Sequence, residues 1–168
     1  MQKILLPVAG TANDRLAVQQ VIKRFANDSA MEVHLLNVQP PFDSHVANFS
    51  SRRSRNEFHR ERAEKALAPV KDMLDRHSIP SAVHVEVGDP ATAIVAAARR
   101  LQCDEIVMAT ARKNSLTRLV EVSVTDRVIE RTPVPVEVVS GSEISKWERY
   151  GIPALIGAGL AMALAIAD

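Results

Sequence analysis

The chain has 168 residues, which suits one α/β domain and leaves no room for a second full one. Its 21 basic and 20 acidic side chains give a net charge of +1, so no overall field favours nucleic acid and any basic site must be local. Cys103 is the only cysteine, which excludes an internal disulfide, and the first residues lack a cleavable signal pattern, so we expect an intracellular protein.

Apolar runs alternate with stretches of helical periodicity in the first half of the chain. Residues 4–8 predict a buried strand, and apolar positions recurring at helical spacing in 16–25 predict the helix that follows it. A second strand is expected at 31–38, where two prolines stop it. Residues 42–55 show no period and predict a polar loop, which leads into a helix from about Asn56 to His77.

The second half of the chain continues the same alternation. A third strand is predicted at 83–87, where valines alternate with polar residues, so one of its faces should be less buried. A helix from Pro90, a buried strand at 106–109, a helix ending near Arg131 and a strand at 134–139 follow. Because alternating strands and helices require right-handed parallel crossovers, the pattern predicts a doubly wound α/β sheet with helices on both faces.

Several segments near these strand ends form a collinear set: 3–8, 36–38, 88–91 with Ile94, 104–108, and Ser123 and Val124 leading through Val128 to 133–136. Together these segments resemble the universal stress protein family. They occur in the family's order and spacing over about residues 2–139, and this collinearity makes the resemblance specific although each segment is weak alone. The resemblance implies a five-stranded parallel sheet in the order 3-2-1-4-5, commonly dimeric, with some members binding ATP and others not.

The glycine-rich loop of the family's ATP-binding branch is altered in this chain. That loop has the form G-x-x-G-x(9)-G-S/T after the fourth strand, because phosphates need close backbone approach and exposed N–H donors. The acidic residue that members often carry after the first strand is replaced by Ala9. We therefore expect no cofactor and disfavour the usual ATP mode. The glycine positions hold Ala109, Arg112 and Val122, the optional glycine is Ser115, and only Thr110 and Ser123 remain.

The same loop also carries several basic side chains, which could form a different kind of binding site. Arg112, Lys113 and Arg118 precede or begin the last helix, whose N-terminus favours an anion. An anion site built from side chains could replace the backbone cradle, and a solvated basic loop is the alternative. The residues expected in a nucleotide or anion site are Pro7, Val38, Thr110, Arg112, Lys113, Ser115 and Ser123.

Catalytic and metal-binding patterns are missing from the sequence. The five histidines have no spacing that would present two metal ligands on one face, so we expect no metal site. Ser115 and Ser123 have neither a nearby histidine nor a G-x-S-x-G turn, and Cys103 has no C-x-x-C partner. We expect no catalytic residue and no enzyme activity.

The last strand has an edge position in the implied sheet order. An apolar edge left open invites uncontrolled pairing, and two copies pairing about a twofold axis would cover it. The expected dimer interface comprises Val134, Val136 and Val138. A monomer whose tail covers the edge is the alternative.

The C-terminal tail departs from an ordinary soluble composition. We divide the chain into an α/β domain at 1–140, a linker at 141–150 and an apolar tail helix at 151–168. The tail has no charged side chain before its last residue, and about 17 residues at 1.5 Å each barely approach the thickness of a bilayer. We expect membrane contact through 147–167 on the cytoplasmic face, and packing against protein is the alternative.

Taken together, the sequence favours a non-catalytic stress-response regulator that acts as a homodimer with an unknown protein partner and without nucleic acid. A nucleotide or anion sensor, with weak ATP binding or hydrolysis through the loop from Arg112 to Ser123, is the alternative.

Overall fold

The computed structural model describes residues 1–42, 51–110 and 124–140. The predicted linker, the apolar tail helix and the basic loop from Arg112 to Ser123 lie outside these ranges. Within them, none of the helices combines the length and apolarity needed to cross a bilayer.

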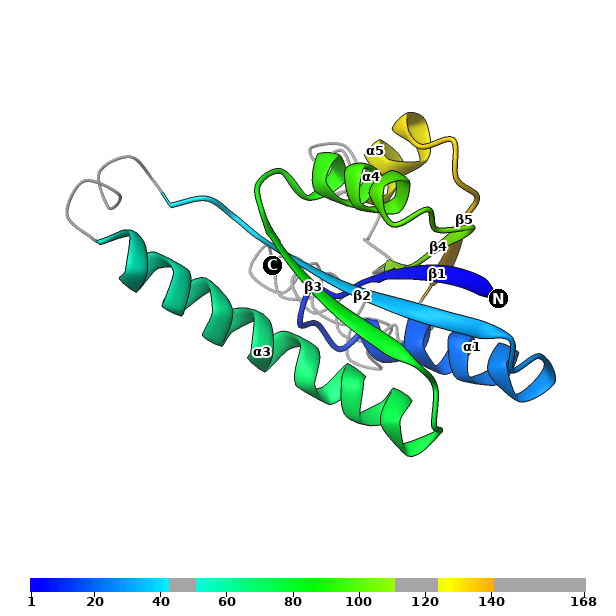
Figure 1. Ribbon diagram of the computed structural model, residues 1–168. Helices are drawn as coiled ribbons and strands as arrows, with labels where there is room; N and C mark the ends of the chain where they lie inside the picture. Colours follow the sequence, from blue (N-terminus) through cyan, green and yellow to red (C-terminus); the bar gives the residue numbers. More distant parts are fainter. Residues whose placement is uncertain (43–50, 111–123, 141–168) are drawn as a thin grey trace, which may run out of the picture.

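A five-stranded parallel sheet forms the centre of the domain, in the order β3-β2-β1-β4-β5 (Figure 1). This confirms the predicted fold class and strand order. The strands are β1 (Gln2–Pro7), β2 (Met31–Gln39), β3 (Ser81–Val87), β4 (Glu105–Thr110) and β5 (Val136–Ser140). The helices are α1 (Asp14–Asn27), α3 (Arg52–Arg76), α4 (Pro90–Arg100) and α5 (Val124–Arg131).

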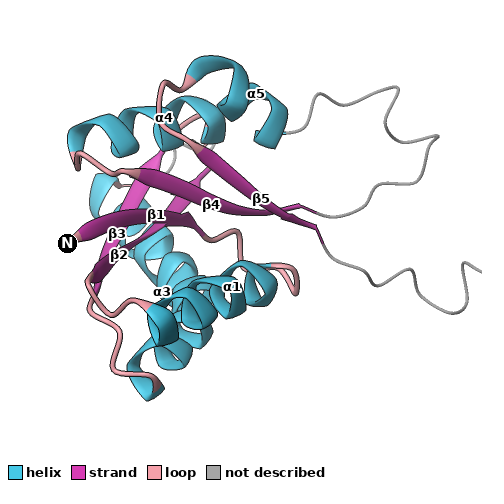
Figure 2. Cartoon of the chain, turned by 90° about the vertical axis from the view of Figure 1, so that its right-hand side faces the viewer, coloured by secondary structure: helices cyan, strands magenta, loops and turns pink. Residues whose placement is uncertain are grey.

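Helices cover both faces of the sheet, with α1 and α3 on one side and α4 and α5 on the other (Figure 2). Successive residues of β1 point to opposite faces, so Ile4 and Leu6 enter the core under α1 and α3, whereas Leu5 enters the core under α4 and α5. All three are fully buried. Because both faces of β1 are buried, consecutive residues of this strand are apolar.

Two element boundaries differ from the predicted ones for local reasons. Helix α3 begins at Arg52 rather than near Asn56, because the Ser51 hydroxyl accepts a hydrogen bond from the backbone N–H of Ser54 at 3.1 Å. Strand β5 begins at Val136 rather than at Val134. Pro135 before it has no N–H, although its carbonyl still accepts from Ile106 N at 2.9 Å.

Strand β3 lies at one edge of the sheet, and its valines form the more exposed of its two sides. Val83, Val85 and Val87 are 44%, 42% and 50% exposed, whereas His84 and Glu86 on the α4 side are partly buried. One face is thus less buried, as the alternation predicts, but it is the apolar one. Polarity alone does not identify the buried side of an edge strand.

Candidate functional site

The carboxyl edge of the sheet brings together three of the residues predicted for a binding site. Strands β2, β1 and β4 are neighbours, with Pro7 paired to Leu36 in register. By alternation along the strands, Pro7, Val38 and Thr110 all lie on the α4–α5 face at the strand ends, and each is partly buried. Four further predicted residues, Arg112, Lys113, Ser115 and Ser123, lie outside the described part of the chain.

The loop after β1 is held against α3. Gly10 has φ of +80°, and a Cβ atom at this position would lie 3.2 Å from the Cβ of Ala66, so a glycine suits both the backbone and the space. Thr11 donates its backbone N–H to Asp14 Oδ2 at 2.7 Å. The buried carboxylate of Asp14 therefore orders the loop, and position 9, where family members often carry an acid, presents the exposed methyl group of Ala9.

Two buried amides connect the end of β2 to the end of β1. Gln39 Nε2 donates to Asn37 Oδ1 at 2.5 Å, and Asn37 Nδ2 donates to the carbonyl of Val8 at 2.7 Å. Asn37 is 2% exposed. The sequence analysis did not identify these amides. Residues two apart in a strand lie on the same face, so the spacing of Asn37 and Gln39 was the available signal. They fix the geometry of the strand ends that border the candidate site.

Asp89 and Arg127 join the two helices of the α4–α5 face near the same edge. Asp89 Oδ1 caps α4 by accepting from the N–H and hydroxyl of Thr92 at 3.0 and 2.7 Å, and it accepts from Arg127 of α5 at 2.7 Å. The hydrogen bond from the Thr92 hydroxyl, followed by that from Arg127, lowers the pKa of Asp89 to about 2. Asp89 and Arg127 thus connect α4 to α5.

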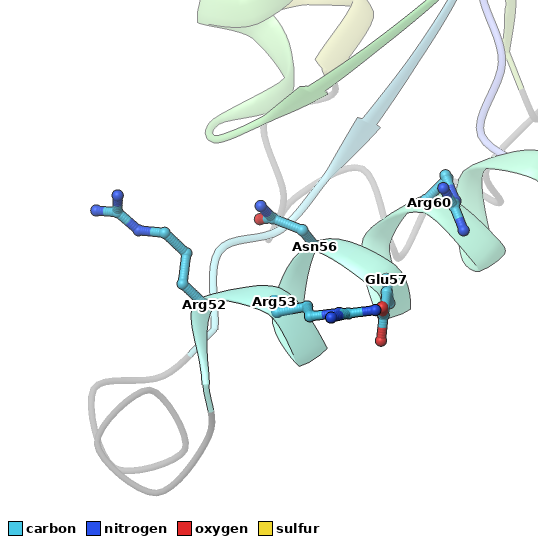
Figure 3. Close-up of a pocket in the computed structure, with 5 residues that line it drawn as sticks. All are labelled: Arg52, Arg53, Asn56, Glu57 and Arg60. Atoms are coloured by element: carbon cyan, nitrogen blue, oxygen red, sulfur yellow. The ribbon is translucent and has the colours of Figure 1, made fainter.

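The first turns of α3 carry a basic pocket of about 430 Å³, lined by Arg52, Arg53, Asn56, Glu57 and Arg60 (Figure 3). Sequence reasoning missed it because it placed Arg52 and Arg53 in a polar loop. Once the helix begins at Arg52, the spacing of 52, 56 and 60 puts these side chains on one face. Arg53 Nε contacts Glu57 Oε1 at 3.0 Å, and Arg60 Nε lies 3.7 Å from Glu64.

Comparison with known proteins identifies the family of this chain. Residues 1–140 match the universal stress protein family. The chain belongs to that family. Universal stress protein MJ0531 of Methanocaldococcus jannaschii is 32% identical over 142 residues, which cover 82% of this chain and 81% of the relative. Stress response protein NhaX of Bacillus subtilis is 29% identical over 79 residues, so that match spans about half of either protein, 47% of this chain and 48% of NhaX.

Solved structures share the architecture of this universal stress protein. The structure of MJ0577, whose biochemical function was assigned from its structure, superposes with a TM-score of 0.70 at 27% identity and covers 84% of this chain and 97% of its own. A universal stress protein in complex with cAMP gives a TM-score of 0.60 at 18% identity, covering 83% and 96%. A family member from Arabidopsis thaliana with AMP bound gives 0.61 at 14% identity, covering 83% and 92%. The last two likenesses show the fold alone.

Two histidines meet on the α4 face of this universal stress protein, away from the carboxyl edge. His34 Nδ1 of β2 lies 3.0 Å from His84 Nε2 of β3, a hydrogen bond in which one ring donates. His34 Nε2 is buried without a hydrogen-bond partner and lies 3.8 Å from Glu32. The sequence predicted no paired histidines because the parallel register joins residues 50 positions apart. No group of three or more metal-binding side chains occurs in the described residues.

Acidification is expected to destabilise the domain through this pair. Burial, followed by the charges of His34 and Arg100, lowers the pKa of His84 below 6.5. At His84 the unfolded chain therefore binds a proton more readily than the folded chain. The contribution of neutral His84 to the free energy of unfolding is complete above about pH 6.5 and is lost as the pH falls toward the lower folded pKa. Urea unfolding at about pH 7.5 and about pH 5.5 measures the loss.

A matched pair of substitutions isolates the contribution of His84. His84→Gln should remove part of the pH dependence, whereas His77→Gln, at an exposed position where α3 ends, should leave it unchanged. Equal pH profiles for His84→Gln and the natural protein would show that other groups cause the loss.

Proposed function

We propose that this universal stress protein is a non-catalytic regulator of the stress response that acts as a homodimer and does not bind ATP in the family's usual mode. The observation that supports this proposal best is the carboxyl edge of the sheet, where Ala9 replaces the expected acid and Asp14 is already engaged by Thr11. At the described strand ends, Pro7 and Val38 are apolar and partly buried.

The lone thiol supports a non-catalytic role. Cys103 is buried, and this burial is the main cause that raises its pKa, so the thiolate form needed for nucleophilic attack is disfavoured. A phosphate-release assay with ATP tests the absence of catalysis. Release no faster than in buffer is expected, and saturable release that follows the protein through purification would overturn the proposal.

The edge position of β5 supports a homodimer. On its outer side β5 has no neighbour among the described strands, so its backbone groups are available to a second copy. Val134 and Val136 pack partly against the α4–α5 core of their own chain, whereas Val138 is 38% exposed. Of the three valines, Val138 therefore has the most surface to offer a partner.

Val138→Lys is expected to convert the dimer to a monomer, because two lysines would lie close together across the twofold axis and the apolar contact would be lost. Val136→Lys is a poorer test because it would also disturb the chain's own core. Val83→Lys is the matched control, since this valine has similar exposure on the opposite edge strand. Light scattering gives the molar mass. A Val138→Lys protein that stays dimeric would place the interface elsewhere.

A nucleotide or anion sensor is the second candidate. It is supported by solved relatives that hold cAMP, AMP and dAMP and by the cations at Arg112 and Lys113. If an anion binds there, side-chain cations must replace the missing glycine N–H donors, so Arg112→Ala with Lys113→Ala should weaken binding. Unchanged affinity for ATP in the double variant would remove this candidate.

We further propose that the protein works in the cytoplasm and is attached to the membrane by its tail. Residues 151–167 have no charged side chain, and Trp147 and Tyr150 precede them, as aromatic residues do at membrane interfaces. Their number is small for a full crossing, so shallow attachment is the form we propose.

A further inference from the structure

Helix α3 concentrates positive charge in its first half. Residues 51–65 carry six cationic and three acidic side chains, a net charge of +3, while the whole chain has only +1. The second half of the helix is balanced. The ion pairs of Arg53 and Arg60 with Glu57 and Glu64 are exposed, and such pairs are weak enough for the guanidinium groups to turn toward another anion.

This basic half extends past the carboxyl edge of the sheet. Gly10, just beyond the end of β1, lies against Ala66 of α3. Arg52 precedes Ala66 by 14 residues, which corresponds to about 21 Å of helix. Figure 1 shows the first turns of α3 extending away from the strands in this direction. The arginines of the pocket thus form one end of the molecule.

Strand β5, which precedes the apolar tail in the sequence, ends at the carboxyl edge of the sheet. Ser140, the last residue of β5, pairs with Thr110 at the carboxyl end of β4, and all five strands are parallel. The last described residue of the chain, Ser140, therefore lies at the edge beyond which α3 extends. The opposite edge holds the ends of α1, α3 and α4.

We propose that the arginine-rich end of α3 is a second membrane contact, which binds the phosphate headgroups of an anionic bilayer surface. This inference rests on the proposed membrane attachment by the tail. A single short apolar segment binds bilayers reversibly, and a neighbouring basic patch supplies the second contact that makes attachment stable.

The chemistry of this end suits such a surface. Guanidinium groups form paired hydrogen bonds with phosphate oxygens. Arg52, Arg53 and Arg60 all line the pocket, with Arg52 pointing away from the other two (Figure 3). Phe58 lies on the opposite side of α3 from the pocket and is 44% exposed, with the guanidinium of Arg62 5.5 Å from its ring centroid. Helices that lie at a membrane surface combine basic side chains on one face with Trp, Phe or Leu on the other.

Flotation of the full chain with lipid vesicles tests the proposal. We expect stronger binding to vesicles that contain phosphatidylglycerol than to phosphatidylcholine alone, and a decline of that preference with added salt. Removing Arg52, Arg53 and Arg60 by substitution with Gln should weaken binding to the anionic vesicles at least about tenfold. It should leave binding to phosphatidylcholine unchanged.

The matched control removes the same charge from the opposite edge. Lys23, Arg76 and Arg99 are exposed near the ends of α1, α3 and α4, and their joint replacement by Gln should preserve the anionic preference. Equal losses in the two triple variants would show a net-charge effect and overturn the proposal. Equal binding to both vesicle types would also overturn it while leaving attachment by the tail intact. A chain that floats with neither would overturn both.

Discussion

Asn37→Ala is expected to lower the free energy of unfolding by about 3 kcal/mol, because it removes a buried group that makes two hydrogen bonds. Without the amide, the Val8 carbonyl loses its donor and Gln39 Nε2 loses its acceptor, and a small cavity opens. Urea unfolding followed by circular dichroism measures the change.

Asn27→Ala is the matched control for this prediction. The amide of Asn27 is exposed and donates only to the carbonyl of Lys23 within its own helix, so its removal should change the free energy of unfolding by less than about 0.5 kcal/mol. Similar losses in the two variants would mean that the amides at the end of β2 do not fix the strand ends.

Arg24→Ala is expected to cost about 2 kcal/mol of unfolding free energy, because it leaves two carboxylates without their main cation. Arg24 donates to Glu105 of β4 at 2.6 Å and to Glu137 of β5 at 2.9 Å, and the hydrogen bond with Glu105 is the main cause that raises the pKa of Arg24. The expected cost is smaller than for a fully buried pair because Glu137 remains 30% exposed.

Lys23→Ala separates this network from a general loss of helix charge. Lys23 is exposed on α1 next to Arg24, so its replacement should leave the unfolding free energy within about 0.5 kcal/mol of the natural value. If Arg24→Ala also falls within that range, the ion pairs contribute nothing measurable.

The sequence predicts the order of elements well because each buried strand is a short apolar run with turn residues on either side. The apolar runs at 4–8 and 106–109 need no long-range information to be recognised as strands. By contrast, the contact between His34 and His84 depends on the register of two strands joined by a long helix, and no local pattern sets that register. Contacts that depend on strand register can therefore be identified only from the structure.

The candidate site is predictable only in part for the same reason. The rule that ligands bind at the carboxyl ends of parallel strands places Pro7, Val38 and Thr110 correctly at one edge. The basic pocket depends on where α3 begins, which the hydroxyl of Ser51 decides. A serine among polar residues is too common to mark a helix start, so the sequence alone predicts a loop at Arg52.

Calorimetric titration of the protein with ATP at physiological salt tests the central claim most directly. The missing glycines and Ala9 predict an affinity weaker than about 100 μM, which corresponds to less than about 5.5 kcal/mol of binding free energy. A heat signal that shows no saturation at micromolar ATP is the expected result. Saturable binding with a low-micromolar dissociation constant would contradict the proposal that this family member acts without the usual nucleotide.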